Sequence, residues 1–174
     1  MQKPEALLSK DITFDFCREN EKKELYELFL EILKEGNSYP QTLPFNFEEF
    51  LNYFSPKNSK VLICKKNNTE IIGACYIKPN FPGRSSHIAN CGYIVKKQYR
   101  GQKIGFHLGK RSIDIAKELG YRGIIFNLVF KENIASIKLW EKLGFKIIGT
   151  IPDAAKKDDM NFQDAHIMFL KLYP

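Results

Sequence analysis

The sequence has no long apolar run and no closely spaced cysteines. No stretch approaches the roughly 18 apolar residues that a membrane-spanning helix needs. The four cysteines form no Cys-x-x-Cys pair, which argues against a metal site or a redox dithiol, and each lies in an apolar stretch typical of a small buried residue: Cys17, Cys64, Cys75 and Cys91. Residues 1–6 lack the apolar core and cleavage site of a signal peptide. These absences predict a soluble, cytoplasmic protein that holds no metal.

Acidic residues are missing from one long segment. Between Ile71 and Ile113 there is no Asp or Glu, yet eight basic residues fall there: Lys78, Arg84, Lys96, Lys97, Arg100, Lys103, Lys110 and Arg111. The net charge of +7 therefore arises in this segment, because the rest of the chain is close to neutral. A local basic patch indicates an anionic partner, and nucleic acid, a membrane surface and a phosphorylated cofactor all remain open at this point.

The order of predicted elements indicates an α/β fold. With 174 residues, 44% hydrophobic and 27% charged, the chain is expected to form one globular domain over residues 1–174. Hydrophobic periodicity predicts strands at 11–17, 61–64, 71–77, 87–95, 123–130, 146–151 and 165–172, and helices at 25–36, 47–54, 104–119 and 135–143. This order predicts a mixed, mostly antiparallel sheet with helices on both faces.

The sequence also predicts one turn, two helix ends and one helix face. Residues 65–68 are predicted to connect a β-hairpin. Gly36 and Gly144 are expected to end their helices, and Leu119 is expected on the buried face of the helix at 104–119.

The most informative segment is residues 93–105, which are predicted to form a strand, a glycine-containing loop and the start of a helix. Glycines let backbone N–H groups converge on one point, and the helix N-terminus adds positive charge, so the segment is suited to a pyrophosphate. A P-loop is excluded, because Ile104 and Arg111 stand where that motif needs Gly and Ser or Thr. The G-x-G-x-x-G motif is also absent, since Gly101, Gly105 and Gly109 are four residues apart.

Two motifs resemble those of the GCN5-related N-acetyltransferases (GNAT). Residues 98–103 (QYRGQK) are similar to the acetyl-CoA loop Q/R-x-x-G-x-G/A, with Lys103 at the usual Gly or Ala. Residues 133–145 (NIASIKLWEKLGF) resemble the segment N-x-x-[AS]-x-x-[LF]-Y-x-x-x-G-F. The resemblance implies the GNAT fold, an acetyl-CoA co-substrate and a small-molecule amine acceptor. It places the coenzyme against Tyr93, Ile94, Val95, Arg100, Gly101, Gln102, Lys103, Ile104, Gly105 and Phe106.

A closer resemblance is to the fungal N-acetyltransferases of azetidine-2-carboxylate and related proline analogues, enzymes of amino-acid analogue detoxification. Residues 80–84 (NFPGR), 86–90 (SHIAN) and 126–130 (FNLVF) carry it. It implies that Asn90 meets the substrate nitrogen and that Asn127 and Leu128 hold the substrate carboxylate. It also implies that the coenzyme meets Asn133, with Ser136 beside it in the same segment.

The resemblance further implies how transfer is catalysed. The backbone N–H of Val95 is expected to stabilise the developing oxyanion. Trp140 stands where the family usually has a tyrosine acid, and Asn90 lies near the position of the usual glutamate base. We therefore expect Asn90 to orient the amine and water to remove its proton. His87, on a strand expected to be half-buried, is interpreted as structural, and neither His107 nor His166 has partners at ligand spacing.

Two rival functions remain. One is acetylation of peptide or protein amines. The other is a nucleic-acid-binding module that uses the basic segment, with Tyr93, Tyr99 and Phe106 as its candidate stacking residues. We favour the small-molecule enzyme, without a nucleic-acid or membrane partner, and a homodimer stays open.

Overall fold

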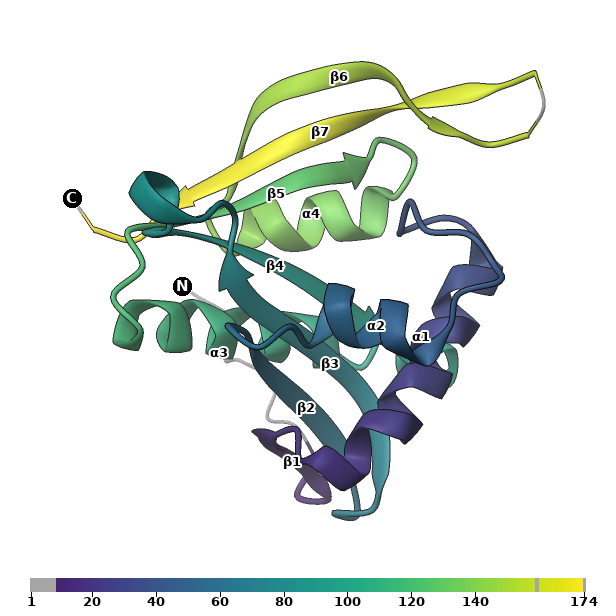
Figure 1. Cartoon of the computed structure of the whole chain (residues 1–174), viewed down its shortest axis with the longest axis vertical. Helices are drawn as coiled ribbons and strands as arrows, with labels where there is room; N and C mark the ends of the chain where they lie inside the picture. Colours follow the sequence, from purple (N-terminus) through teal and green to yellow (C-terminus); the bar gives the residue numbers. More distant parts are fainter. Residues whose placement is uncertain (1–8, 159, 174) are drawn as a thin grey trace, which may run out of the picture.

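A computed structural model describes residues 9–158 and 160–173, so the segment 1–6 considered above lies outside the described residues. Its strands are β1 (Ile12–Phe16), β2 (Lys60–Lys66), β3 (Glu70–Pro79), β4 (Ile88–Val95), β5 (Gly123–Phe130), β6 (Lys146–Lys156) and β7 (Phe162–Lys171). Its α-helices are α1 (Lys22–Glu35), α2 (Phe47–Phe54), α3 (Ile104–Glu118) and α4 (Ile134–Lys142). Short 3-10 turns cover Glu19–Glu21, Gly83–Ser85 and Lys97–Tyr99. The predicted order of elements and the α/β class are confirmed (Figure 1).

The strands form a single mixed sheet. Within the described residues it has seven strands in the order β1-β2-β3-β4-β5-β7-β6. Every neighbouring pair in that part of the chain is antiparallel except β4 and β5, which run parallel. The parallel pair is also the shortest, because it joins only residues 88–90 to residues 123–125. Beyond that point the two strands separate toward their carboxyl ends, as Figure 1 shows.

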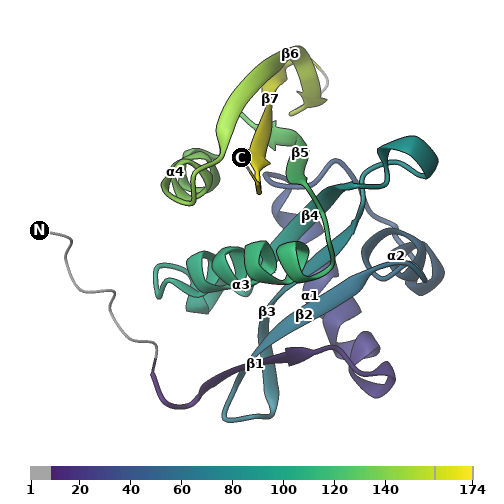
Figure 2. The same cartoon turned by 90° about the vertical axis from the view of Figure 1, so that its left-hand side faces the viewer.

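Helices cover both faces of the sheet, as predicted. Figure 2 shows α1 and α2 on one face, with α3 and α4 on the other. On the first face, α1 and α2 bury their apolar residues against alternate residues of β2 and β3. On the second, α3 packs on the opposite residues of the same strands, and α4 packs beside β5 and β7. Burial of these apolar faces, at about 25 cal/mol per Å² removed from water, is the main stabilisation of both layers.

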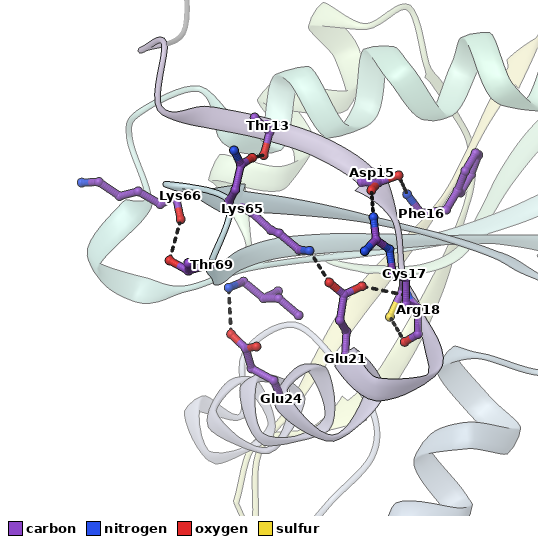
Figure 3. A network of polar contacts seen from close by, with 12 residues as sticks. Thr13, Asp15, Phe16, Cys17, Arg18, Glu21, Glu24, Lys65, Lys66 and Thr69 are labelled. Carbon is purple, nitrogen blue, oxygen red and sulfur yellow. Dashed lines mark hydrogen bonds and ion pairs between the residues drawn. The ribbon is translucent and has the colours of Figure 1, made fainter.

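One ion pair and one hydrogen bond to the backbone hold the start of α1 on the β2–β3 hairpin (Figure 3). Glu21 accepts a hydrogen bond from the Arg18 backbone N–H at 2.8 Å and also pairs with Lys65 of β2. One turn later, the Glu24 carboxylate accepts from the Ile71 backbone N–H at 2.8 Å. These contacts attach one end of α1 to the hairpin, and Glu35 at its other end pairs with Arg100 in the loop before α3.

Helix ends follow the sequence closely, with one error. Gly36 ends α1 at a φ of +67°, the left-handed conformation that glycine adopts most easily. Asn46 caps α2 by accepting from the Glu49 backbone N–H at 2.9 Å. The prediction that Leu119 is buried is wrong, since it is 46% exposed at the end of α3. The buried stripe of α3 continues instead through Ser112 and Ala116.

Three predicted boundaries or placements shift. The hairpin turn lies at Asn67 and Asn68, whose φ angles of 52° and 59° suit asparagine, so residues 65 and 66 belong to β2. Strands β6 and β7 extend well beyond the predicted ranges into a longer hairpin. His87 is exposed rather than half-buried and precedes β4. Within the described residues, no helix has both the length and the apolar character to span a membrane.

Candidate active site

A cleft of about 940 Å³ opens where β4 and β5 separate. One part of its lining comes from the loop before α3, the first turn of α3, and α4. The other part comes from the segment after α1, from α2, and from β3, β4 and β5. Every site residue expected from the sequence lines this cleft except Gln102, whose side-chain amide instead folds back on the Gln98 carbonyl at 3.3 Å. The geometry therefore brings the predicted residues together.

The free edge of β4 points into the gap. The Lys96 backbone N–H donates to the Ile72 carbonyl at 2.9 Å, so alternate residues of β4 face β3. Val95, one residue earlier, directs its backbone N–H and carbonyl toward the gap. Its carbonyl accepts from Arg100 Nε at 3.0 Å, and the Tyr93 carbonyl accepts from the Tyr39 hydroxyl at 3.1 Å. By the same alternation, the Ile94 backbone faces β3 and its side chain is buried.

The loop before α3 turns at two residues with a positive φ. Gly101 has a φ of +79° and Lys103 a φ of +63°, both left-handed. Lys103, at the usual Gly or Ala position, therefore adopts a conformation that favours glycine. No side chain caps the helix, and its first turn has no acidic residue. The N–H groups of Ile104, Gly105 and Phe106 have no acceptor within the helix, which leaves an electropositive end at the cleft.

Basic side chains of this loop are partly committed to protein carboxylates. Arg100 makes a two-point ion pair with Glu35 at 2.7 and 2.9 Å. Lys96 pairs with Glu70 at 2.8 Å, and Glu70 also accepts from the Tyr99 hydroxyl at 2.7 Å. Arg100 thus braces the loop on the end of α1 and does not direct an unpaired charge at the cleft. Lys103 lines the same region at the start of α3.

Asn90 joins the two strands at the base of the gap. Its Nδ2 donates to the Ile125 carbonyl at 3.0 Å, and its Oδ1 accepts from the Tyr76 hydroxyl at 3.1 Å. The Tyr76 ring reaches Asn90 by crossing Gly92, where a Cβ atom would lie only 2.5 Å from the ring. The Tyr53 hydroxyl lies 3.4 Å from that of Tyr76. A polar chain of two tyrosines and one asparagine therefore lines this wall.

Asn127 and Leu128 lie at an irregularity of β5. The register of β5 with β7 shifts between Phe126 and Val129, so the two intervening residues leave the regular ladder. The Asn127 side-chain amide donates to Asn80 Oδ1 at 2.6 Å, which links β5 to the loop after β3 across the gap. Asn127 and Leu128 both line the cleft, two and three positions beyond Ile125, whose carbonyl accepts from Asn90.

Asn133 and Ser136 form the start of α4. The Asn133 side chain caps the helix by accepting from the Ser136 backbone N–H at 3.2 Å. Both residues line the cleft beside the loop that precedes α3. Helices α3 and α4 approach closely here. A Cβ atom added to Gly105 would lie 3.3 Å from Leu139, and one added to Gly109 would lie 2.5 Å from Leu143.

Comparison with known proteins identifies this arrangement. The profile of the acetyltransferase (GNAT) family matches residues 22–145, a range that runs from α1 to the start of β6. The chain belongs to the GNAT acetyltransferase family. That assignment confirms the family expected from the two motifs.

Relatives of this GNAT chain are found both among protein sequences and among solved structures. N-acetyltransferase aca1 of Schizosaccharomyces pombe is 45% identical over 100 residues, which cover 57% of this chain and 48% of that protein. The match thus spans about half the length of this curated relative. A solved GCN5-related N-acetyltransferase from Kribbella flavida superposes with a TM-score of 0.86 at 26% identity, covering 93% of this chain and 98% of that chain. A phosphinothricin acetyltransferase from Sinorhizobium meliloti, solved in complex with AcCoA, gives a TM-score of 0.83 at 16% identity over 92% of this chain and 88% of that chain, a likeness of fold alone.

The GNAT cleft is poor in groups that exchange protons near neutral pH. Among the described residues that line it there is no Asp, Glu or His. Burial raises the pKa of the Cys91 thiol to about 12, and burial also holds the pKa of Tyr39 and Tyr93 well above the usual range. Burial lowers the pKa of Lys78. The described residues also contain no cluster of three or more His, Cys, Asp or Glu that could hold a metal.

Trp140 is a packing residue. It is 6% exposed, and its ring lies 4.4 Å from Tyr93 and 4.8 Å from Phe126 between ring centroids. The Tyr93 hydroxyl in turn contacts the Ser112 hydroxyl at 2.7 Å. This aromatic cluster supports β4 and β5 from the α4 side.

The cleft residues that sequence reasoning missed include four with polar side chains on the α1–α2 side: Tyr39, Tyr53, Tyr76 and Lys78. Tyr39 follows the Gly36 turn and Tyr53 lies on α2, so only the packing of the α1–α2 face brings them to β3 and β4. Tyr76 and Lys78 alternate along β3 on the face that carries Asn90, a signal that was available in the sequence once the β3–β4 register was known.

Proposed function

We propose that this protein is an acetyl-CoA-dependent N-acetyltransferase of small amines that carry a carboxylate, with azetidine-2-carboxylate and similar proline analogues as the leading acceptors. The observation that carries the proposal is the cleft between β4 and β5. It is lined at one end by the start of α3, which no side chain caps, and elsewhere by several asparagines. The name of the fission yeast relative also supports N-acetyl transfer.

The residues present fit acetyl-CoA. The backbone of residues 101–106 and the electropositive start of α3 suit a pyrophosphate, with Lys103 adding charge. Gly105 of α3 leaves room for Leu139 of α4, and Asn133 and Ser136 at the start of α4 line the same cleft. The free edge of β4 at Tyr93 and Val95 offers hydrogen bonds to an extended chain. When bound, acetyl-CoA supplies an acetyl group activated as a thioester.

The chain contributes electrostatic stabilisation and orientation. Val95 directs its backbone N–H into the gap, where it would donate to the carbonyl oxygen as negative charge develops there. A C–N bond forms to the amine while the C–S bond breaks. The amine proton passes to water, because no described lining residue is a carboxylate or histidine base. The leaving thiolate needs no strong acid, since a thiol pKa near 8.5 makes it a fair leaving group.

Asn90 orients the amine in this proposal. A side-chain carbonyl oxygen accepts two hydrogen bonds, and Oδ1 of Asn90 already accepts one from Tyr76. The second lone pair is available to an amine N–H. The backbone amides of Asn127 and Leu128 on the facing strand would donate to the acceptor carboxylate, since both residues line the cleft at the irregularity of β5.

The basic segment gives less support to nucleic-acid binding than its composition indicates. Lys96 and Arg100 both pair with glutamates contributed by other elements. Tyr93 is packed inside the molecule against Phe126 and Trp140, and it cannot stack on a base there.

The test is release of free thiol from acetyl-CoA by the purified protein, measured with a panel of small amino acids, amines and peptides. We expect thiol release with azetidine-2-carboxylate and weak release with peptides. Activity restricted to peptides would reject the small-molecule acceptor, and the absence of activity with every amine would reject the transferase proposal.

A further inference from the structure

The cleft carries an asymmetric charge. Its described lining residues include four basic side chains and no acidic one: Lys78, Arg100, Lys103 and Lys142. Arg100 is paired with Glu35. Lys103 starts α3, and Lys142 ends α4 with its Nζ over the Phe106 ring at 4.8 Å. Arg100, Lys103 and Lys142 therefore lie around the loop before α3, whereas Lys78 lies on β3.

Lys78 lies in the same row as the residue proposed to meet the amine. Its Cα is the direct cross-strand partner of the Asn90 Cα, and Asn90 is in turn paired with Ile125 of β5. Directly opposed residues in a sheet project to the same face. Two residues beyond Lys78, Asn80 contacts the Asn127 side chain across the gap. Lys78 therefore belongs to the wall that receives the acceptor.

The ammonium group of Lys78 is enclosed without a counter-ion. It lies 4.4 Å from the Tyr76 ring centroid and 4.6 Å from that of Tyr53, and it donates one hydrogen bond to the Tyr53 backbone carbonyl. Among the described residues it makes no ion pair with a carboxylate. Ring faces and one carbonyl attract the cation but leave its charge uncompensated, so a bound anion would be stabilised strongly at this place.

We propose that Lys78 binds the carboxylate of the acceptor and makes the cleft select amines with an adjacent anionic group over neutral and cationic amines. This inference rests on the proposed acetyl transfer. The amides of Asn127 and Leu128 fix the carboxylate from β5, and Lys78 supplies the full positive charge from β3. A second positive charge on the acceptor, as in a polyamine or a lysine side chain, meets repulsion and finds no carboxylate in the described lining.

The test compares Lys78→Met with Lys78→Arg, using azetidine-2-carboxylate and its neutral carboxamide as acceptors. Loss of a charge-assisted hydrogen bond predicts a fall of about 10- to 100-fold in kcat/KM for the acid in Lys78→Met, with a change below about threefold for the carboxamide. Lys78→Arg should retain most of the preference for the acid. Lys60→Met, which removes the same charge from an exposed position on β2, is the matched control and should keep the wild-type ratio.

Binding measurements separate failure of this inference from failure of the proposed function. The N-acetylated acid is titrated calorimetrically into each variant, and stabilisation by acetyl-CoA checks that the coenzyme end of the cleft is intact. If the N-acetylated acid binds more weakly to Lys78→Met than to the wild type, and acetyl-CoA still stabilises the variant normally, the carboxylate site is supported even if no amine is acetylated. Unchanged binding, or equal losses of activity with the acid and the carboxamide, would overturn it.

Discussion

The side-chain amide of Asn90 on β4 donates to the backbone carbonyl of Ile125 on β5 at 3.0 Å, at the last paired position before the two strands separate. The same side chain accepts from the Tyr76 hydroxyl on the opposite side. One residue thus fixes the base of the cleft and presents an acceptor oxygen inside it.

Replacement of the Asn90 side chain should reduce the rate of acetyl transfer more than it weakens coenzyme binding. Asn90→Ala leaves the Ile125 carbonyl and the Tyr76 hydroxyl without their partner, at a cost of about 1–3 kcal/mol in the free energy of unfolding. We expect kcat to fall by a larger factor than the KM for acetyl-CoA rises. Steady-state kinetics with both substrates varied, together with thermal unfolding, measures the two effects. A raised KM for acetyl-CoA at unchanged kcat would contradict the placement of Asn90.

Gly92 leaves the space in which Tyr76 reaches Asn90. A Cβ at this position would lie 2.5 Å from the Tyr76 ring, so Gly92→Ala must displace the ring from its contact with Asn90. We expect a loss of about tenfold or more in kcat/KM for the amine, the effect of disturbing an orienting hydrogen bond. Gly149→Ala on β6 is the control, because its Cβ would make an ordinary 3.7 Å contact with Ile167. Equal activity of the two variants would show that the tyrosine does not orient Asn90.

The variant Gly101→Glu tests whether the loop before α3 binds the coenzyme. Acetyl-CoA should raise the Tm of the wild-type protein by mass action, and the variant should lose that shift because it brings an acid to the electropositive start of α3. Gly120→Glu adds the same charge at a φ of +81° in open space outside the cleft, against +79° in open space at Gly101. The backbone strain is therefore matched. A folded Gly101→Glu protein that acetyl-CoA stabilises normally would exclude this loop as the pyrophosphate site.

Trp140 is expected to support the site without donating a proton. Trp140→Phe removes part of the contact with Tyr93 and Phe126, which should reduce stability by about 0.5–3 kcal/mol. Most of the turnover should remain when the assay is run well below the Tm. A loss of about a thousandfold in kcat with normal coenzyme binding would show that the indole takes part in the reaction.

The sequence predicts the elements well where the local pattern and the end signals agree. The α1 helix combines a regular apolar stripe with a glycine at its end, and both are seen. Leu119 continues the same spacing, but α3 ends at Glu118 and the Leu119 side chain just after it is exposed. The full length of β6 is set by its pairing with β7. Because most residues of β6 are exposed, its sequence shows no alternation of apolar and polar residues from which the length could be predicted.

The site was predictable as a set of motifs but incomplete as a cavity. The glycine loop and the asparagines stand in recognisable segments, and they do line one cleft. Lys78 counted in the sequence only as one member of a basic segment. Its role depends on Tyr53 from α2 and Tyr76 from β3 lying on either side of it, a tertiary arrangement without a local signature. Arg100 shows the reverse, because its charge is bound by Glu35, a residue 65 positions away in the sequence.

The most direct test of the account compares thiol release from acetyl-CoA with azetidine-2-carboxylate and with azetidine as the acceptor. Loss of the carboxylate leaves donors in the cleft unpaired, at about 1–3 kcal/mol each, so the acid should exceed azetidine by at least roughly tenfold in kcat/KM. Equal activity on the two amines, or no activity on either beside strong activity on a peptide, would contradict the account.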